Sequence, residues 1–166
     1  ASGESGGNSV SWGFYEKQDL DQWLDWVEEH HGGGNIGVHG ISMGAATALM
    51  HAEMNEATHR VKFYIADSSY SDLETLLTQQ IDDAVYLHDP LWVKMLLGYS
   101  SIAANWQSGF PYRDVSPVRS VSNVTTPILY FHGNVDVIVP AYRSEQLYAA
   151  TKGYKEKYIF SGDAHV

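Results

Sequence analysis

Short apolar runs alternate with longer amphipathic stretches along this chain. Each run is followed at once by glycine, serine or aspartate, and the runs cover residues 35–39, 61–66, 127–132 and 157–160. Their short length and the turn-forming residues behind them predict buried β-strands. Helical spacing of apolar residues predicts helices over residues 16–30, 45–55 and 143–151. Because strands that alternate with helices form parallel sheets with crossover connections, the pattern predicts an α/β fold with a mainly parallel sheet.

The first of these helices has a clear apolar stripe and a clear end. Residues 16–30 carry Leu20, Trp23, Leu24 and Val27 at helical spacing, and a run of three glycines at residues 32–34 follows. Glycine after the last turn is a typical helix stop. We expect this helix to pack its apolar stripe against the sheet.

Residues from about 70 to 126 are too many for a plain crossover between two strands. Their aromatic and aliphatic content predicts a mostly helical insertion, which we interpret as a lid over the active site. The alternative is that these side chains only complete the core, as apolar residues commonly do. The lid interpretation predicts an apolar substrate pocket lined by Trp92, Met95, Trp106 and Phe110.

Composition narrows the class of protein. The chain has 166 residues, of which 44% are hydrophobic, enough for one domain with a real core, and no apolar run is long enough to span a membrane. A net charge of −10 repels phosphate backbones and argues against nucleic acid as a partner. The chain has no cysteine, which excludes disulfides and thiol catalysis but leaves both a cytoplasmic and a bacterial cell-surface or extracellular location open.

The turn after the first predicted strand carries a serine between two glycines. Gly40-Ile41-Ser42-Met43-Gly44 lies between the strand and the helix, which is the setting of a nucleophile elbow. A strand that turns directly into a helix strains the serine backbone, and we expect side chains at positions 40 and 44 to collide with nearby backbone. The pentapeptide alone also arises by chance in a chain with 15 glycines. The strand before it and the helix after it favour a nucleophile.

Three segments together resemble the α/β-hydrolase superfamily, and within it bacterial hydrolases related to serine aminopeptidases and acyl esterases. The segments are VHGISMGA at residues 38–45, PILYFHGNVDVIVP at 127–140 and GDAHV at 162–166. The resemblance covers nearly the whole chain, and the order serine, aspartate, histidine is the order that this superfamily uses. It implies one catalytic domain over residues 1–166, incomplete relative to the family and carrying the lid insertion at about 70–126. It implies no cofactor.

The resemblance implies a catalytic triad of Ser42, Asp136 and His165. A serine needs a base to take its proton, and the base works best when a carboxylate fixes its tautomer. Each of the three follows a predicted strand, so all three should meet at the carboxyl edge of the sheet. The backbone N–H of Met43 is the expected oxyanion-hole donor. Asp67 also follows a strand and is the alternative acid, although the H-G-x-x-D-x-x-V-P pattern around Asp136 matches the family over a longer stretch.

Other histidines give only a weak indication of metal binding. His30, His31 and His51 have no acidic or imidazole partner at ligand spacing, so we expect no metal. His39 flanks the elbow, and His132 flanks the loop that carries Asp136, which we name the acid loop. We interpret both as packed, hydrogen-bonded imidazoles. Asp163, two residues before His165, is expected only to shape its loop.

Two classes of function follow. The first is a serine hydrolase that cleaves a carboxylic ester or related acyl bond of a small-molecule substrate through an acyl-enzyme, with a serine aminopeptidase as a variant. The second is a noncatalytic binding or assembly module on a truncated hydrolase scaffold. The family's sheet begins with strands and a second oxyanion donor that we do not find in this chain, which opens on a Gly/Ser loop without methionine. We therefore expect an upstream segment or a second chain to pair with the elbow strand.

Overall fold

A computed structural model describes residue 6 and residues 10–84 and 90–165 of the chain. Four parallel strands form one sheet in the order β1-β2-β3-β4, so strands that follow one another in sequence are neighbours in space. The strands are β1 (Ile36–Ile41), β2 (Val61–Asp67), β3 (Ile128–Gly133) and β4 (Lys155–Phe160). All four lie within one or two residues of the apolar runs that predict them, which confirms the α/β class.

The strand register brings the carboxyl ends of the strands together. Ile41, the last residue of β1, pairs with Asp67 of β2, and Asp67 pairs with Phe131 near the end of β3. Gly133 pairs with Phe160 at the end of β4. The loops that follow the strands therefore leave the sheet at one edge, where α/β proteins place their ligands.

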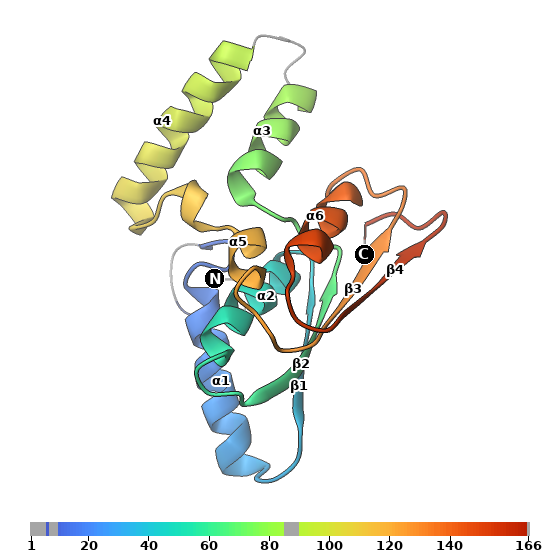
Figure 1. Cartoon of the computed structure of the whole chain (residues 1–166). Helices are drawn as coiled ribbons and strands as arrows, with labels where there is room; N and C mark the ends of the chain where they lie inside the picture. Colours follow the sequence, from blue (N-terminus) through green and yellow to red (C-terminus); the bar gives the residue numbers. More distant parts are fainter. Residues whose placement is uncertain (1–5, 7–9, 85–89, 166) are drawn as a thin grey trace.

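Helices cover one face of the sheet. Helix α2 (Met43–Asn55) packs on β1 and β2, α6 (Tyr142–Ala150) packs on β3 and β4, and α5 (Pro117–Val121) lies between these two helices (Figure 1). The small residues of α2 let it approach the strands closely. The main core lies between these helices and the sheet, and its buried members include Ala45, Ala48, Leu49, Ala52, Tyr64, Ala66, Val121, Ile128, Tyr130 and Leu147.

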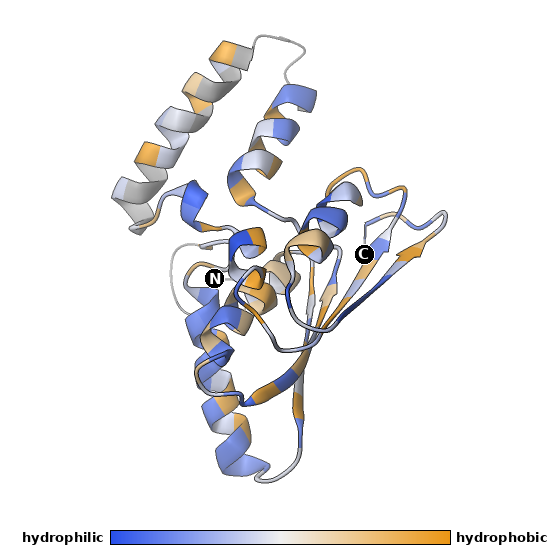
Figure 2. Ribbon diagram, in the orientation of Figure 1, coloured by the Kyte–Doolittle hydropathy of each residue, from blue (hydrophilic) through white to orange (hydrophobic). Residues whose placement is uncertain are grey.

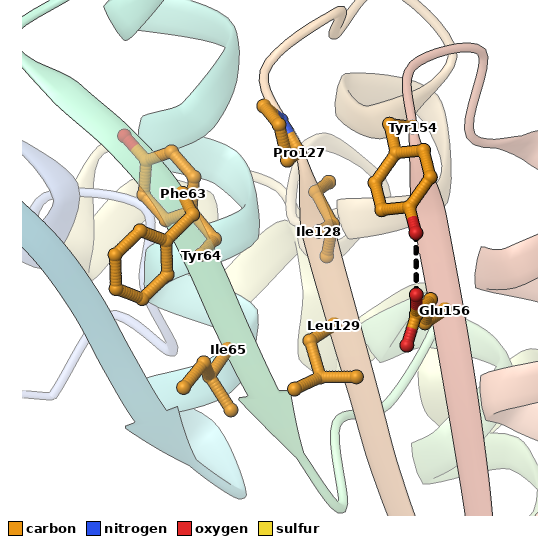
Figure 3. A pocket seen from close by; sticks show the side chains of 8 residues that line it. All are labelled: Phe63, Tyr64, Ile65, Pro127, Ile128, Leu129, Tyr154 and Glu156. Carbon is orange, nitrogen blue, oxygen red and sulfur yellow. Dashed lines mark hydrogen bonds between the residues drawn. The ribbon is translucent and has the colours of Figure 1, made fainter.

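No described helix covers the opposite face of the sheet. Residues that alternate with the core positions point to this side, so we name it the bare face and define it by Ile41, Phe63, Ile65, Leu129, Phe131, Tyr158 and Phe160. Four of the seven are exposed, although parallel strands are usually buried on both sides. Figure 2 shows that apolar residues are frequent in these strands. A hollow of about 290 Å³ lies on this face, where Phe63, Ile65 and Leu129 stand on one side of neighbouring strands (Figure 3). It lies at the amino halves of the strands, away from the loop edge.

Helix α1 (Glu16–His30) has the predicted bounds but a different contact. It packs against α2 rather than against the sheet, with Leu24 as its buried residue, while Trp23 is 63% exposed. Arg60, just before β2, holds the helix through Asp25 at 2.7 Å and Glu28 at 3.0 Å. The predicted packing on the sheet is wrong, because α2 already covers the strands on this side.

The insertion expected over about residues 70–126 divides into two parts. Helices α3 (Leu73–Ala84) and α4 (Pro90–Ser108) contact each other and project from the body, and we name them the cap hairpin (Figure 1). Residues 85–89, between the two helices in sequence, lie outside the described residues. A short 3₁₀ helix, η1 (Tyr112–Asp114), follows the hairpin. Beyond it, Val121 and Val124 belong to the main core, so the last part of the predicted insertion is not part of the cap hairpin.

Candidate active site

Ser42 lies at a strained turn between β1 and α2. Its φ of 53° and ψ of −117° fall where L-residues are uncommon, and such strain is concentrated at functional sites. The Ser42 N–H donates to the carbonyl of Asp67 on the neighbouring strand at 2.8 Å, which helps to hold the strained turn. Helix α2 begins at the next residue, so the positive end of its dipole lies beside the Ser42 hydroxyl.

The two glycines of the elbow are not equivalent. A Cβ on Gly40 would lie 2.2 Å from the carbonyl oxygen of Gly44 and 2.7 Å from the nitrogen of Ala45, so only glycine fits there. A Cβ on Gly44 would meet nothing within 4 Å. The expectation of a steric clash at both positions is therefore wrong for Gly44, which lies exposed in the first turn of α2.

His165 joins Ser42 to Asp136. Its Nε2 lies 2.9 Å from the Oγ of Ser42, and its Nδ1 lies 2.6 Å from Oδ2 of Asp136. The side chain of Asp136 is fully buried and that of His165 is 14% exposed. One imidazole thus bridges a serine hydroxyl and a buried carboxylate, with a different ring nitrogen facing each.

Three hydrogen-bond donors surround the carboxylate of Asp136. Its Oδ1 accepts the backbone N–H groups of Ile138 at 2.9 Å and Val139 at 2.8 Å. Its Oδ2 faces His165 and also lies 3.2 Å from Nε2 of His132. The loop after β3 therefore folds back on the carboxylate and fixes the direction in which each oxygen points.

His132 lies beside the Asp136 carboxylate, a contact that the sequence did not predict. Its fully buried ring contacts the Val139 carbonyl through Nε2 at 2.6 Å and the Ser144 hydroxyl through Nδ1 at 2.6 Å. Its interpretation as a packed, hydrogen-bonded imidazole agrees with these contacts. The sequence signal for its contact with Asp136 is its position four residues before that aspartate, near the end of a buried strand.

The loops that carry Asp136 and His165 are bound to each other. The Val135 N–H donates to the carbonyl of Asp163 at 3.1 Å, and the Gly162 N–H donates to the Asn134 side chain at 2.8 Å. A Cβ on Gly133 would lie 2.3 Å from that same Asp163 carbonyl. Asp163 thus shapes the loop through its backbone, and the close approach requires glycine at position 133.

Asp67, the alternative acid, contributes its backbone to the elbow. Its carbonyl accepts the Ser42 N–H, and its carboxylate accepts the Ser68 hydroxyl at 3.0 Å. The carboxylate that contacts His165 belongs to Asp136. Of the two candidate acids, the structure brings Asp136 to the imidazole.

The four predicted pocket residues do not come together in one pocket. Phe110 is 2% exposed and stacks on Phe14 with the ring centroids 5.0 Å apart, so it belongs to a second core cluster beneath the cap hairpin. Trp92, Met95 and Trp106 lie exposed on α4, and Trp106 is 93% exposed. A helix that is apolar on most sides does not reveal from sequence which side faces the body.

Of the other histidines, His51 and His30 are engaged in local contacts, whereas His39 is exposed, so its interpretation as a packed imidazole is wrong. Nδ1 of His51 lies 2.7 Å from the Tyr64 hydroxyl, and its Nε2 lies 3.3 Å from Asp21. His30 stacks on Trp26 with the ring centroids 4.4 Å apart. Within residues 10–84 and 90–165, no three histidine, aspartate or glutamate side chains form a group that could hold a metal ion. In that same part of the chain, no helix combines the length and apolarity needed to cross a membrane.

Comparison with solved structures reveals the same fold in larger enzymes. The esterase Pf2001 of Pyrococcus furiosus aligns with a TM-score of 0.68 at 19% identity, over 99% of this chain and 58% of that chain. The acylaminoacyl peptidase of Pyrococcus horikoshii aligns with a TM-score of 0.65 at 22% identity, over 92% and 24% of the two chains. A puromycin-hydrolyzing peptidase of Mycobacterium tuberculosis gives 0.68 at 20% identity, over 93% and 22%. At these identities the likeness shows the fold, that of the α/β-hydrolases.

Sequence comparison identifies a family. The uncharacterized protein YqkD of Bacillus subtilis (strain 168) is 33% identical over 164 residues, which cover 98% of this chain and 52% of that protein. This chain thus spans about half the length of this curated relative. The family described as Serine hydrolase (FSH1) matches residues 7–166, nearly the whole chain. The chain belongs to this serine hydrolase family.

Proposed function

We propose that the protein is a serine hydrolase that cleaves a carboxylic ester or related acyl bond of a small-molecule substrate through an acyl-enzyme. The observation that carries the proposal is the double contact of His165, with Ser42 at one nitrogen and Asp136 at the other. Family membership supports the same reaction class. The strained elbow adds support, because it presents a hydroxyl beside a helix amino terminus.

In the first half of the reaction, Ser42 Oγ attacks the acyl carbon while His165 Nε2 takes the hydroxyl proton. The buried carboxylate of Asp136 accepts a hydrogen bond from the Nδ1–H group, which leaves Nε2 unprotonated and able to act as the base, and it stabilises the imidazolium that forms. The imidazolium then gives its proton to the leaving alcohol or amine as the acyl–oxygen or acyl–nitrogen bond breaks. Ser42 is left as an ester.

Water completes the cycle by the same route. His165 Nε2 takes a proton from water, whose oxygen attacks the acyl carbon, and the proton returns to Ser42 Oγ as the acid leaves. In both halves, negative charge develops on the acyl oxygen. Met43 is the first residue of α2, so its N–H has no acceptor within the helix and is the donor that we assign to this oxygen.

The acyl substrate is uncharged or cationic rather than anionic in this proposal, because the chain carries a net charge of −10. Ester and amide substrates use the same three side chains, so the triad does not choose between them. The solved neighbours include both an esterase and an acylaminoacyl peptidase. An aminopeptidase is therefore the variant of this proposal that substrate tests must separate.

The bare face and the β1 edge favour a larger working unit. β1 pairs only with β2 in the described sheet, so its other side offers unpaired backbone groups. We propose that additional polypeptide extends the sheet beside β1, covers the bare face and provides the second oxyanion donor. Loss of one such donor typically lowers the rate by about 10²–10³. Residues 1–166 alone would then behave as the noncatalytic module, with little hydrolysis.

Trapping the acyl-enzyme tests this proposal. The longest natural polypeptide that carries this chain should be mixed with p-nitrophenyl acetate and, separately, with an aminoacyl p-nitroanilide, then quenched in acid for mass spectrometry. We expect an added acetyl group on the peptide that contains Ser42, and none in the Ser42→Ala variant. Preferential turnover of the anilide would select the aminopeptidase variant. Absence of an adduct and of turnover with either substrate would contradict the hydrolase and favour the noncatalytic module.

A further inference from the structure

Helix α4 carries an exposed apolar seam. Trp92, Met95, Tyr99, Ile102 and Trp106 follow one another at intervals of three, four, three and four residues. All five are exposed, with Trp92 at 66%, Tyr99 at 76% and Trp106 at 93%. Spacing of this kind is the a/d pattern by which one α-helix packs along another.

The seam faces away from the body of the protein. On the other side of α4, the Ser101 hydroxyl oxygen accepts the backbone N–H of Tyr112 at 3.3 Å, which ties that side to η1. Helix α4 also packs against α3, and it lies on the outer side of the cap hairpin (Figure 1). Figure 2 shows apolar residues recurring along its length. The seam is therefore open to a partner while the opposite side of the helix is in use.

The charge around the seam favours a protein partner over a membrane. Across Pro90–Ser108 the only charged side chain is that of Lys94, although the chain carries 20 acidic residues. Helices that lie on membranes are typically rich in lysine and arginine on their polar face. An acidic protein with one lysine on this helix would be repelled by anionic lipid. An uncharged seam, in contrast, lets two acidic copies meet without placing like charges face to face.

The order of residues in the seam is nearly the same in both directions. Tyr99 is at the centre, Trp92 and Trp106 lie seven residues to either side, and Met95 and Ile102 lie four and three residues away. Two antiparallel copies related by a two-fold axis at Tyr99 would place each Trp92 beside Trp106 of the second copy. They would place each Met95 beside Ile102 of the second copy. A surface that complements itself in this way is what a two-fold interface requires.

We propose that α4 is a homodimerisation helix, which pairs antiparallel with α4 of a second copy of this chain about a two-fold axis at Tyr99. The exposed parts of the three aromatic side chains amount to roughly 450 Å² per copy. That is more than half of the approximately 800 Å² that each partner buries in an interface of standard size. The cap hairpin contacts α6, which follows the loop that carries Asp136, because the Tyr142 hydroxyl donates to the Gln79 side chain at 2.8 Å. The dimer would therefore join the caps of two sites.

Residues 1–166 contain no cysteine, so single cysteines placed in α4 test the pairing directly once any cysteine elsewhere in the polypeptide is replaced by serine. Single variants Trp92→Cys, Tyr99→Cys and Trp106→Cys should be made in the longest natural polypeptide and oxidised with copper phenanthroline. We expect Tyr99→Cys to cross-link with itself. Trp92→Cys and Trp106→Cys should cross-link when mixed and remain single when alone. If Trp92→Cys alone formed cross-linked dimers, and Trp106→Cys alone did so too, the two helices would be parallel and the proposed arrangement would be overturned.

Sedimentation equilibrium measures the strength of the association. We expect the unmodified protein to be a dimer, and Tyr99→Asp to weaken it at least about thirtyfold, as loss of a central aromatic contact does. Trp23→Asp changes an aromatic residue of similar exposure on α1 and should leave the dimer intact. Circular dichroism checks that both variants stay folded. A monomer at 100 µM, or a monomer that binds phosphatidylcholine vesicles through this helix, would overturn the proposal. None of these readouts depends on hydrolysis, so failure here is distinguishable from failure of the proposed function.

Discussion

Replacement of Asp136 by asparagine should disable the site while leaving its shape nearly unchanged. Oδ1 of Asp136 accepts two backbone N–H groups, from Ile138 and Val139, and an amide nitrogen cannot take that position without opposing both donors. The amide of Asn therefore places its NH₂ group where Oδ2 now lies, 2.6 Å from Nδ1 of His165. A donor at this point makes Nδ1 an acceptor and puts the ring proton on Nε2.

The cost of the wrong tautomer is large because Nε2 is the nitrogen that faces Ser42 at 2.9 Å. An Nε2–H cannot accept the hydroxyl proton, so the base is lost although the imidazole remains in place. In serine hydrolases with this arrangement, the same change lowers kcat by about 10⁴. A factor of 10⁴ corresponds to about 5.4 kcal/mol of transition-state stabilisation. We expect a similar loss for Asp136→Asn, with little change in KM.

Steady-state hydrolysis of a p-nitrophenyl ester by the longest natural polypeptide measures this loss. Asp67→Asn is the matched control, because Asp67 also lies at the carboxyl edge of the sheet, as the last residue of β2, but gives only its backbone to Ser42. We expect this variant to keep kcat within about tenfold of the unmodified protein. Equal losses in both variants, or a loss of under tenfold in Asp136→Asn, would refute the assignment of Asp136 as the residue that orients His165.

Three further outcomes follow from the local geometry. Gly40→Ala should lower the free energy of unfolding by at least about 1–3 kcal/mol, because its Cβ meets backbone, whereas Gly44→Ala should be nearly neutral in urea denaturation. His132→Ala should lower the free energy of unfolding by about 2–4 kcal/mol and lower kcat with little change in KM. His132→Gln should recover part of kcat. An unchanged kcat in the alanine variant would limit this imidazole to a packing role. Burial raises the pKa of Glu56, but hydrogen bonds from two threonine residues outweigh it and lower the pKa to about 2. The ionised side chain therefore stabilises the fold above pH 4.5, and this stabilisation should fade as the pH falls from about 4.5 towards 2; a Glu56→Gln variant with the same pH dependence of unfolding would contradict this reasoning.

The sequence predicts the elements of this fold well where a single physical signal dominates. Helix α1 begins and ends as expected, because its periodic apolar residues stop at a run of glycines. The strands are found because each is short, apolar and followed by a turn residue. The proximity of Ser42, His165 and Asp136 is expected because parallel strands deliver their following loops to one edge. In each case the information is local or follows directly from strand order.

The sequence could not predict how the elements pack on one another in three dimensions. Leu24 of α1 packs on α2 because α2 already occupies the adjacent face of the sheet. Phe110 is in the core while Trp106 is exposed, although both are apolar residues of the same insertion. The contact of His132 with Asp136 arises from the path of the acid loop, which no periodic pattern encodes. The bare face likewise leaves little trace in the two central strands, β2 and β3, whose residues are mostly apolar on both sides.

Covalent labelling of Ser42 is the most direct test of the proposed triad. A fluorophosphonate probe reacts with a serine only when a neighbouring base activates it, as His165 is proposed to do here. The probe should be applied to the longest natural polypeptide, to Ser42→Ala, and to Ser161→Ala as a control for an exposed serine in the loop before His165. We expect a single adduct on the peptide that contains Ser42, present in the control and absent in Ser42→Ala. An adduct that persists in Ser42→Ala, or no adduct in the folded unmodified protein, would contradict the proposed triad.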